Sequence, residues 1–288
     1  MLAQHTCQDI FLMNLVLQMY GKCGSIADAK STFDAMERTN VFSWNIMIAA
    51  YAQNGHYKEA IVLFWEMRCP PSRITFINVL TACAGLGDLA ELEANIHERA
   101  RGIGLDTDLA TMNSLITMYG NCGSSERSWA IFSSMDIKDV ISWNAMIGSF
   151  SQCGEFQRAM ELSRVMDLEG VRFVGVTFVL VLGACGLNDE SPRDRELLHD
   201  RVMDSGYQDN PVVGSALLSM HGRSGELDRA VEVFERLGDP GLATYNAMLT
   251  QYVQHGRAME ALDLFKRMKR SAMKPNKVTL INLVEACS

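Results

Sequence analysis

The sequence of 288 residues lacks a long hydrophobic run, has only 6 prolines and has no excess of basic residues. No apolar stretch approaches the roughly 18 residues that a membrane-spanning helix needs, so we expect no membrane segment. With 26 Lys and Arg against 34 Asp and Glu, the net charge is −8. Nucleic-acid-binding domains usually carry a basic balance, so binding of that class would have to rest on a local face of this chain.

Several catalytic motifs are also absent. The chain has no His-x-Glu followed by Pro-Cys-x-x-Cys, the pattern of a zinc deaminase. It has no phosphate-binding Walker loop, no Gly-x-Ser-x-Gly elbow and no tight acidic cluster for a nuclease metal site. We therefore expect no catalytic residue and no cofactor in this segment, and we expect that it is not an enzyme.

Eight cysteines and six histidines are present without the spacing of a metal site, since no Cys-x-x-Cys pair occurs. Three cysteines directly precede a glycine that recurs with the repeat period, and three others recur at intervals of 102 residues; these are Cys23, Cys122 and Cys153, and Cys83, Cys185 and Cys287. His97 and His199 are also 102 residues apart. Because free cysteine is usually buried, this phasing predicts small core residues, no metal and no disulfide framework.

One stretch recurs along the chain. VFSWNIMIAAY at 41–51 returns as VISWNAMIGSF at 140–150 and as LATYNAMLTQY at 242–252. Asn45, Asn144 and Asn246 occupy the same place in the three copies, 99 and 102 residues apart. Self-similarity at a fixed spacing indicates an array of stacked units whose function is distributed over the repeats.

Glycines mark a finer period. They are separated by 31, 32, 36, 31, 71 and 31 residues and are Gly24, Gly55, Gly87, Gly123, Gly154, Gly225 and Gly256. Asp189 divides the gap of 71 into 35 and 36, and Asp is among the few residues besides Gly that tolerate a left-handed backbone. The units therefore cycle through three lengths.

Apolar residues on both sides of each glycine keep a helical period. Trp44, Met47, Ile48 and Tyr51 precede Gly55, and Ala60, Leu63, Phe64 and Met67 follow it, each set at i, i+3, i+4 and i+7. Hydroxyl residues are expected just before the first helices as caps; they are Ser43, Thr75, Ser142, Thr177 and Thr244. The pattern predicts an all-α chain of helical hairpins, with Met, Trp44 and Trp143 in the core rather than in a cofactor-stacking surface.

SWNAMI, then Tyr or Phe, then a small residue with Gly, then EA..LF..M resembles the pentatricopeptide repeat, and the three-length cycle resembles its plant PLS subclass. The resemblance implies a right-handed superhelical solenoid of helix-turn-helix repeats. The complete units on this register are 10–40, 41–72, 73–108, 109–139, 140–174, 175–210, 211–241 and 242–276, with partial units at 1–9 and 277–288. Arrays need capping repeats, so we expect a piece of a longer protein. Two departures from the family pattern are a shortened second unit around 69–72 and a polar Ser163 where sister units carry Phe.

The resemblance implies a binding site on the concave face, which the first helices line. In the family, the fifth and the last residue of a unit recognise one base of single-stranded RNA. The corresponding pairs are Asn14 with Asn40, Asn45 with Ser72, Asn113 with Asp139, Asn144 with Val174, Ser215 with Gly241, and Asn246 with Asn276. Asn113 with Asp139 resembles a uracil pair, whereas Ile77 and Val179, the fifth residues of long units, offer no hydrogen bond. Asn near a helix start often serves as a cap, but Ser43, Ser142 and Thr244 occupy the expected capping place.

By the same resemblance, the second residue of each unit would sandwich the bases, and a cation two residues before a hairpin glycine would meet phosphate. The sandwiching residues would be Phe11, Phe42, Ile74, Ile141, Val176 and Val212. The phosphate contacts would be Lys22 and Arg223. So few cations predict a shallow salt dependence of binding.

The competing function is a protein-binding scaffold of tetratricopeptide type without RNA binding, which the acidic charge would suit. Tetratricopeptide units are uniformly about 34 residues long, however, whereas these lengths cycle. PLS-class arrays also imply a chloroplast or mitochondrial location, a part in organellar RNA processing such as C-to-U editing, and multiple organellar RNA editing factor proteins as partners.

Overall fold

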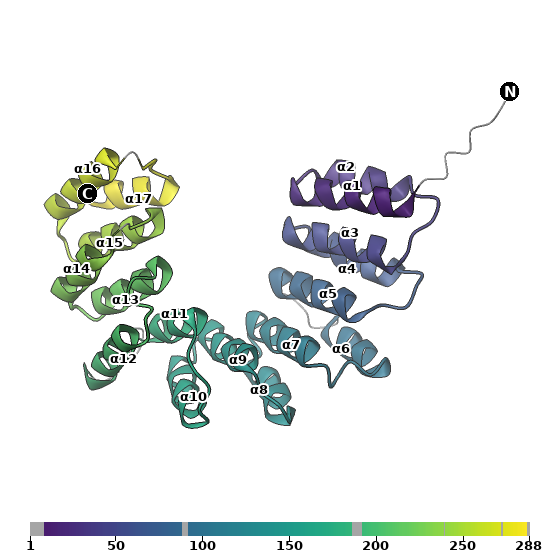
Figure 1. Cartoon of the computed structure of the whole chain (residues 1–288), viewed down its shortest axis with the longest axis horizontal. Coiled ribbons are helices and arrows are strands. Elements are labelled where there is room, and N and C mark those ends of the chain that lie inside the picture. Colours follow the sequence, from purple (N-terminus) through teal and green to yellow (C-terminus); the bar gives the residue numbers. More distant parts are fainter. Residues whose placement is uncertain (1–8, 88–91, 186–191, 239, 272, 287–288) are drawn as a thin grey trace. The chain divides into compact units, whose positions relative to one another are not determined.

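The chain folds into α-helices (Figure 1). The computed structural model describes residues 9–87, 92–185, 192–238, 240–271 and 273–286, and these residues contain seventeen helices and no strand. The all-α prediction is therefore confirmed. Contacts between residues divide the chain into two compact units, 1–153 and 154–288, each with its own stack of helical hairpins.

The first unit contains nine helices among its described residues. They are α1 (Ile10–Lys22), α2 (Ile26–Asp34), α3 (Val41–Gln53), α4 (Tyr57–Glu66), α5 (Arg73–Leu86), α6 (Leu92–Gly102), α7 (Leu109–Asn121), α8 (Ser125–Ser134) and α9 (Val140–Gln152).

The second unit contains eight helices among its described residues. They are α10 (Phe156–Leu168), α11 (Gly175–Ala184), α12 (Pro192–Asp204), α13 (Pro211–Arg223), α14 (Leu227–Arg236), α15 (Leu242–Gln254), α16 (Ala258–Arg270) and α17 (Lys277–Ala286).

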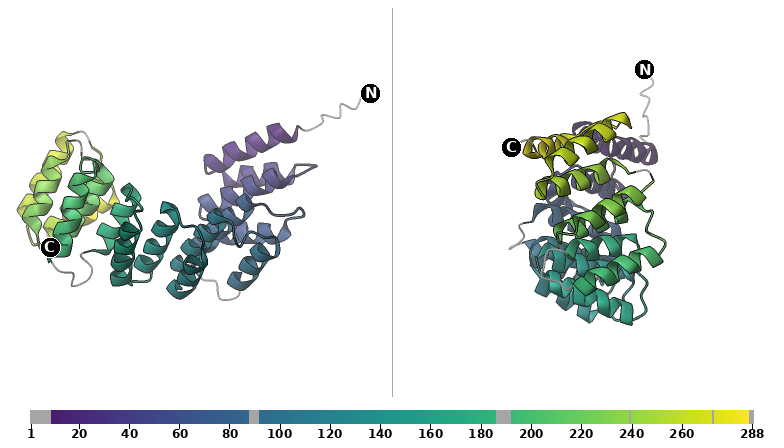
Figure 2. Two further views of the ribbon diagram at one scale, coloured as in Figure 1. Left: turned by 60° about the horizontal axis from the view of Figure 1, so that its bottom comes forward. Right: turned by 90° about the vertical axis from the view of Figure 1, so that its left-hand side faces the viewer.

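Within each unit the first helices of successive hairpins pack in a row (Figures 1 and 2). In the first unit α1, α3, α5, α7 and α9 each contact the next, and in the second unit α11, α13, α15 and α17 do the same. The second helices pack behind this row, since α2, α4 and α8 each contact the first helix of the following hairpin. We call the exposed side of the odd-numbered helices the first-helix face.

The predicted core stripes are buried. Trp44, Met47 and Ile48 on α3 and Leu63 and Phe64 on α4 are at most 7% exposed. The Phe64 ring meets Phe76 of α5 edge to face, with 5.4 Å between ring centroids, and Phe132 meets Trp143 in the same way at 5.1 Å. The indoles of Trp44 and Trp143 therefore belong to the core that joins one hairpin to the next, as predicted.

Small residues allow successive first helices to approach closely. A Cβ built on Gly120 of α7 would lie 2.6 Å from the Cα atom of Ser149 on α9. Gly21 of α1 meets Ala50 of α3 in the same way, with 2.7 Å between the built Cβ and the Ala50 Cβ. Since real Cβ atoms do not come so near a backbone, the spacing of the first helices depends on these glycines.

The hairpin glycines have the left-handed conformation that their period indicated. Gly24, Gly55, Gly87, Gly123, Gly154, Gly225 and Gly256 have φ between 68° and 80°. Gly87, for example, closes α5 at φ 69°, where a side chain would be strained. Asp189, the residue expected to take this place in the long gap, lies outside the described residues, as do Cys287 and residues 1–8.

The prediction that hydroxyl residues stand just before the first helices was wrong by three residues, although the hydroxyls of Ser43, Thr75 and Ser142 do accept a free backbone N–H. The capping position of α3 is Asn40, whose Oδ1 accepts the Ser43 N–H at 3.0 Å, and Ser43 lies in the first turn. Ser72 with Thr75 and Asp139 with Ser142 repeat this arrangement. The other two predicted caps, Thr177 and Thr244, also lie inside their helices. The cap is thus the last residue of the preceding unit, because that residue keeps the extended backbone from which a helix can start.

The cysteine prediction holds only in part. Cys83 and Cys185 are fully buried, whereas Cys23 is exposed, so burial of Cys23 was wrongly predicted. Cys23 ends α1 directly before the turn, where the chain leaves the packed face. Ser163, the departure from the family pattern, is buried; its hydroxyl donates to the Met160 carbonyl at 2.7 Å beside a cavity of about 370 Å³.

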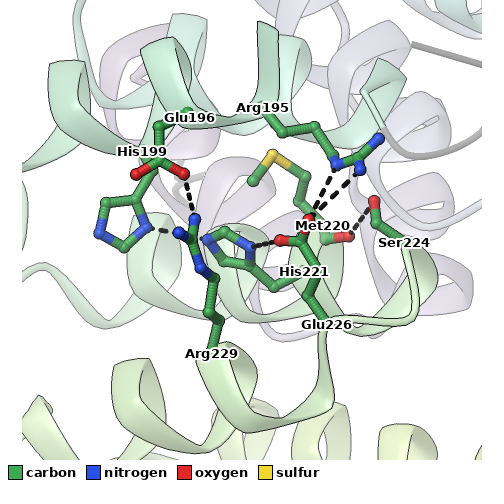
Figure 3. Close-up of polar contacts among 8 residues, drawn as sticks. All are labelled: Arg195, Glu196, His199, Met220, His221, Ser224, Glu226 and Arg229. Carbon is green, nitrogen blue, oxygen red and sulfur yellow. Dashed lines mark hydrogen bonds and ion pairs between the residues drawn. The ribbon is translucent and has the colours of Figure 1, made fainter. Parts of the chain in front are cut away.

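A polar cluster joins α12, α13 and α14 in the second unit (Figure 3). His221 is fully buried; its Nδ1 lies 2.7 Å from Glu226 Oε2, and its Nε2 lies 2.9 Å from His199 Nδ1. Arg195 donates to Glu226 at 3.2 Å, and Arg229 pairs with Glu196. The cluster links three helices by polar contacts in addition to their buried apolar side chains.

Candidate nucleic-acid interface

Three of the predicted base-recognition pairs are brought together by the fold. Asn45 Nδ2 donates to Ser72 Oγ at 3.1 Å, and Asn246 Nδ2 donates to Asn276 Oδ1 at 3.1 Å. Asn113 Nδ2 lies 3.4 Å from Asp139 Oδ1. The partners are 26 to 30 residues apart in the sequence. They meet because the fifth residue lies on a first helix and the last residue caps the next one.

The third residue of the following unit also contacts the fifth residue at three places. Thr75 Oγ1 donates to Asn45 Oδ1 at 2.6 Å, and Thr279 Oγ1 donates to Asn246 Oδ1 at 2.7 Å. Ser215 Oγ and Thr244 Oγ1 are 2.8 Å apart. The fifth residues are therefore held between units and are less free than a surface residue.

The asparagines differ in burial and in partners. Asn45, Asn113 and Asn246 are 7%, 7% and 8% exposed, while Asn14 and Asn144 are half-buried. The Oδ1 atoms of Asn14, Asn113 and Asn144 are buried without a hydrogen-bond partner. A buried acceptor without a partner is costly to the fold. Each of these three oxygens can therefore gain a hydrogen bond if a ligand supplies a donor.

The last residues serve as helix caps as well. Asp139 accepts the N–H of Ser142 at 2.8 Å and its hydroxyl at 2.9 Å through Oδ1. Burial raises the pKa of Asp139, but hydrogen bonds from Ser142 and Asn113 outweigh it and the pKa is lowered. The carboxylate is therefore ionised at neutral pH and can only accept hydrogen bonds. Val174 and Gly241 offer no side-chain hydrogen bond, and Asn40 caps α3 through its side chain.

All six predicted sandwiching residues are exposed apolar side chains at the starts of first helices. Their exposed fractions lie between 50% and 66% for Phe11, Phe42, Ile74, Ile141, Val176 and Val212. Val278, at the corresponding place in α17, is 49% exposed. Apolar side chains repeated on one face of a stack are unusual without a partner, because each exposed apolar group costs hydration free energy.

Two grooves on the first-helix face of the first unit bring these residues together. The first groove, of about 270 Å³, is lined by Lys22, Phe42, Asn45 and Ile74 from α1, α3 and α5. The second groove, of about 690 Å³, is lined by Arg73, Ile77, Asp108, Asn113, Asp139 and Ile141 from α5 to α9. Each groove contains a predicted base-recognition residue beside a predicted sandwiching residue.

The two predicted phosphate contacts differ. Lys22 is exposed at the edge of the first groove. Arg223 is half-buried, and its Nη2 donates to the carbonyls of Leu182, Gly183 and Cys185 at 3.0, 3.3 and 3.0 Å. The last carbonyls of a helix lack partners within it, so this guanidinium group closes the end of α11. The structure thus gives Arg223 an internal role.

Arg73 was missed from the sequence as a site residue. Asp108 is the last residue of the third unit and was not counted as a site residue, because the fifth residue of that unit, Ile77, offers no hydrogen bond. Arg73 is the first residue of its unit and lies beside the predicted sandwiching residue Ile74, at the edge of the second groove. The available signal was a cation at the start of a first helix, where the helix dipole makes a positive charge unfavourable.

No group of three or more His, Cys, Asp or Glu among the described residues is placed to hold a metal ion. None of the helices in the described part of the chain is long and apolar enough to cross a membrane.

Comparison with known proteins agrees with the repeat pattern. The family described as "PPR repeat family" matches residues 39–85 and 240–288, and the model described as "PPR repeat" matches residues 11–41, 110–140, 141–171 and 215–241. The chain belongs to the pentatricopeptide repeat family. A chloroplastic pentatricopeptide repeat-containing protein of Arabidopsis thaliana is 35% identical over 276 residues, covering 95% of this chain and 34% of the relative. A mitochondrial member from the same plant is 29% identical over 284 residues, covering 98% of this chain and 45% of the relative.

Solved structures of the family show the same fold as this pentatricopeptide repeat chain. The crystal structure of PPR10 from maize matches 96% of this chain and 46% of PPR10, with a TM-score of 0.62 and 21% identity. A structure of PPR10 in complex with an 18-nt psaJ RNA element matches 96% of this chain and 41% of that chain, with a TM-score of 0.59 and 22% identity. The chain spans less than half the length of each of these proteins.

Proposed function

We propose that this chain binds single-stranded RNA on the first-helix face and recognises one base per repeat. The observation that carries the proposal is the pairing of fifth and last residues, at 3.1 to 3.4 Å in three units, beside exposed apolar second residues. Amide and carboxylate groups recognise base edges, and apolar side chains pack on base faces. Both kinds of group are needed to hold an unstacked base, and both recur at the repeat period.

The face suits single strands better than duplexes. Base edges in an RNA duplex are paired or lie in a deep, narrow groove, so side chains reach them mainly in single strands. The cations of the described grooves are Lys22 and Arg73, and the net charge of the chain is −8. Affinity for a bare phosphate backbone is therefore low, and base contacts supply the discrimination.

The base order follows from the residue pairs and from the family resemblance. With RNA running parallel to the chain, the units take pyrimidine, C, any base, U, pyrimidine, any base, purine and pyrimidine from the 5′ end. The fourth unit is the best defined, because Asp139 is ionised and accepts the uracil N3–H while the Asn113 amide contacts a uracil carbonyl.

We further propose that the parent protein acts in a chloroplast or mitochondrion, in RNA processing such as C-to-U editing. A chloroplastic and a mitochondrial relative support the organellar part. Editing, and partnership with multiple organellar RNA editing factors, are supported by the three-length repeat cycle of the PLS subclass. The segment itself is proposed to have no deaminase or nuclease activity, since its sequence has no motif for either.

Titration of the chain against random single-stranded and duplex RNA at two salt concentrations tests the proposal. We expect preferential binding to single strands with a shallow salt slope, about 0.7 per phosphate contacted. Equal affinity for single-stranded and duplex RNA would refute the proposal of base recognition and would favour the protein-binding scaffold.

A further inference from the structure

The second groove contains an arginine and an acidic residue that lie side by side at the third unit, whose fifth residue is apolar. Arg73 begins α5, and Asp108 caps α7; their Nη1 and Oδ1 atoms are 3.5 Å apart. Ile77 lies one helical turn after Arg73, so both project from the same side of α5. Ile77 and Asp108 are the fifth and last residues of the third unit, the positions that Asn45 and Ser72 occupy in the second unit.

Helix stability does not account for Arg73. A cation in the first turn opposes the helix dipole, which favours negative charge there. The Arg73 side chain is 58% exposed, and an exposed ion pair contributes little. The guanidinium group is thus available to a ligand in the groove at almost no cost to the fold.

Asp108 divides its two oxygens between two uses. Oδ2 accepts the Thr111 N–H and hydroxyl, both at 2.9 Å, which caps α7. Burial raises the pKa of Asp108, but the Thr111 hydrogen bonds and the charge of Arg73 outweigh it and lower the pKa. Oδ1 faces Arg73 and retains lone pairs for a further donor.

The groove that Arg73 and Asp108 line has room for a base. Its volume of about 690 Å³ lies within the range of ~300–1,000 Å³ usual for ligand sites. Ile77, Leu80 and Ala84 form an apolar wall, and Asn113 with Asp139 occupies the adjoining part. Two neighbouring base sites therefore share one groove.

We propose that the third unit recognises guanine, with Arg73 donating to guanine O6 and N7 and Asp108 Oδ1 accepting from guanine N1–H or N2–H. This inference rests on the proposed RNA-binding function, and it replaces "any base" at the third position. Guanine has two adjacent acceptors that suit an arginine fork and two adjacent donors that suit a carboxylate. Adenine, cytosine and uracil lack this combination.

The test uses the full chain and four labelled RNAs of the proposed order that differ only in G, A, C or U at the third position. Dissociation constants are measured by fluorescence anisotropy. We expect the G probe to bind about tenfold or more tightly than each of the others, as for one bidentate base contact. Arg73→Gln and Arg73→Lys should both abolish this preference, because lysine keeps the charge without the fork. Circular dichroism checks that the variants fold.

Lys22→Gln is the matched control, since Lys22 is the cation of the first groove, which has no carboxylate among its lining residues. This change should weaken all four probes equally. Equal binding of the four probes by the unchanged chain would overturn the guanine assignment, as would an Arg73→Gln variant that loses affinity equally for all of them.

Uracil preference at the fourth position, measured on the same chain, distinguishes this failure from failure of the proposed function. A chain that keeps the uracil preference but is indifferent at the third position refutes the guanine site alone. A chain that binds none of the probes refutes RNA binding, and the guanine site with it.

Discussion

Thr75 donates its hydroxyl to Asn45 Oδ1 across 2.6 Å, so the third residue of one repeat holds the proposed base-recognition residue of the repeat before it. Both side chains are buried. Thr75 Oγ1 also accepts the Ser72 N–H at 2.8 Å, which places it between the cap and the asparagine. One hydroxyl thus couples the start of α5 to the side-chain orientation on α3.

Thr75→Val tests this coupling. Valine has the same shape but leaves Asn45 Oδ1 and the Ser72 N–H without their partner, so we expect unfolding free energy to fall by about 1–3 kcal/mol. Preference for the second base should weaken as well. Thr81→Val on the same helix is the control; Thr81 is exposed and should change stability by less than about 0.5 kcal/mol. Equal effects of the two changes, measured by urea unfolding, would refute the coupling.

Asn113→Thr is expected to shift the fourth base from uracil toward guanine. Threonine keeps a hydroxyl and loses the amide beside Asp139, and by family resemblance that pair prefers guanine. A base-edge hydrogen bond contributes about 1–3 kcal/mol of discrimination, by analogy with DNA, so the preference should change about tenfold or more. Competition between U and G probes at the fourth position measures it. The change also removes the hydrogen bond from Asn113 Nδ2 to Asp139 Oδ1, so the free energy of unfolding should fall by about 0.5–1.5 kcal/mol. If the variant binds every RNA more weakly by the same factor, or if no affinity changes, the asparagines have a structural role only.

Substitution of Lys22 should lower RNA affinity, whereas substitution of Arg223 should lower the stability of the fold. Lys22→Ala removes an exposed cation and should lower RNA affinity for all sequences, with the salt slope reduced by about 0.7. Arg223→Ala leaves three carbonyls at the end of α11 without this donor and should cost about 1–3 kcal/mol of stability. If instead Arg223→Ala lowers RNA affinity without changing stability, the family-derived phosphate role is correct.

Gly120→Ala should destabilise the first unit. The added methyl group would meet the Ser149 backbone at 2.6 Å, and forced overpacking of this kind costs about 1–3 kcal/mol. Gly183→Ala in α11 is the control, because a Cβ there meets nothing within 4 Å and alanine is favoured over glycine in a helix by up to about 1 kcal/mol. Thermal unfolding should therefore move in opposite directions for the two variants. A Gly120→Ala variant that is as stable as the unchanged chain, or more stable, would show that close helix approach is not limiting.

Acidification should weaken the second unit through His199 and His221. Burial lowers the pKa of His221 below 6.5, and the hydrogen bond to Glu226 opposes this without reversing it. Burial likewise lowers the pKa of His199. The unfolded chain then binds more protons than the folded one, so stability is complete above pH 6.5 and falls as the pH drops through that value.

The protonation states explain the direction. Neutral His221 donates from Nδ1 to Glu226 and accepts at Nε2 from His199 Nδ1–H; a second proton on His221 would set two N–H groups against each other. The pKa of Glu226 is lowered by His221 and Arg195 against its burial, so this group adds a further loss below pH 4.5. His199→Gln should flatten the change in melting temperature between pH 7.5 and 5.5. An unchanged slope in this variant would exclude the pair as its cause.

The sequence by itself determined the fold class, the hairpin period and the side of the first helices that is exposed. Apolar residues such as Trp44, Met47 and Ile48 follow a helical spacing that places them on one helix face. A glycine, such as Gly55, recurs wherever the backbone between two helices is left-handed. The exposed side of the same helix then follows by exclusion, which is why Phe42 and Ile74 could be placed on it.

Only the tertiary structure decided which polar groups meet. The caps were assigned three residues too late, because the start of a helix depends on the backbone conformation of Asn40 and not on residue type alone. Arg223 and Lys22 occupy the same place relative to a hairpin glycine in the sequence. In the structure, however, the Arg223 guanidinium group donates to carbonyls at the end of α11. Arg73 and Asp108, 35 residues apart, meet because α5 packs beside α7. Periodicity follows from local geometry, whereas hydrogen-bond partners depend on distances between segments that no local pattern encodes.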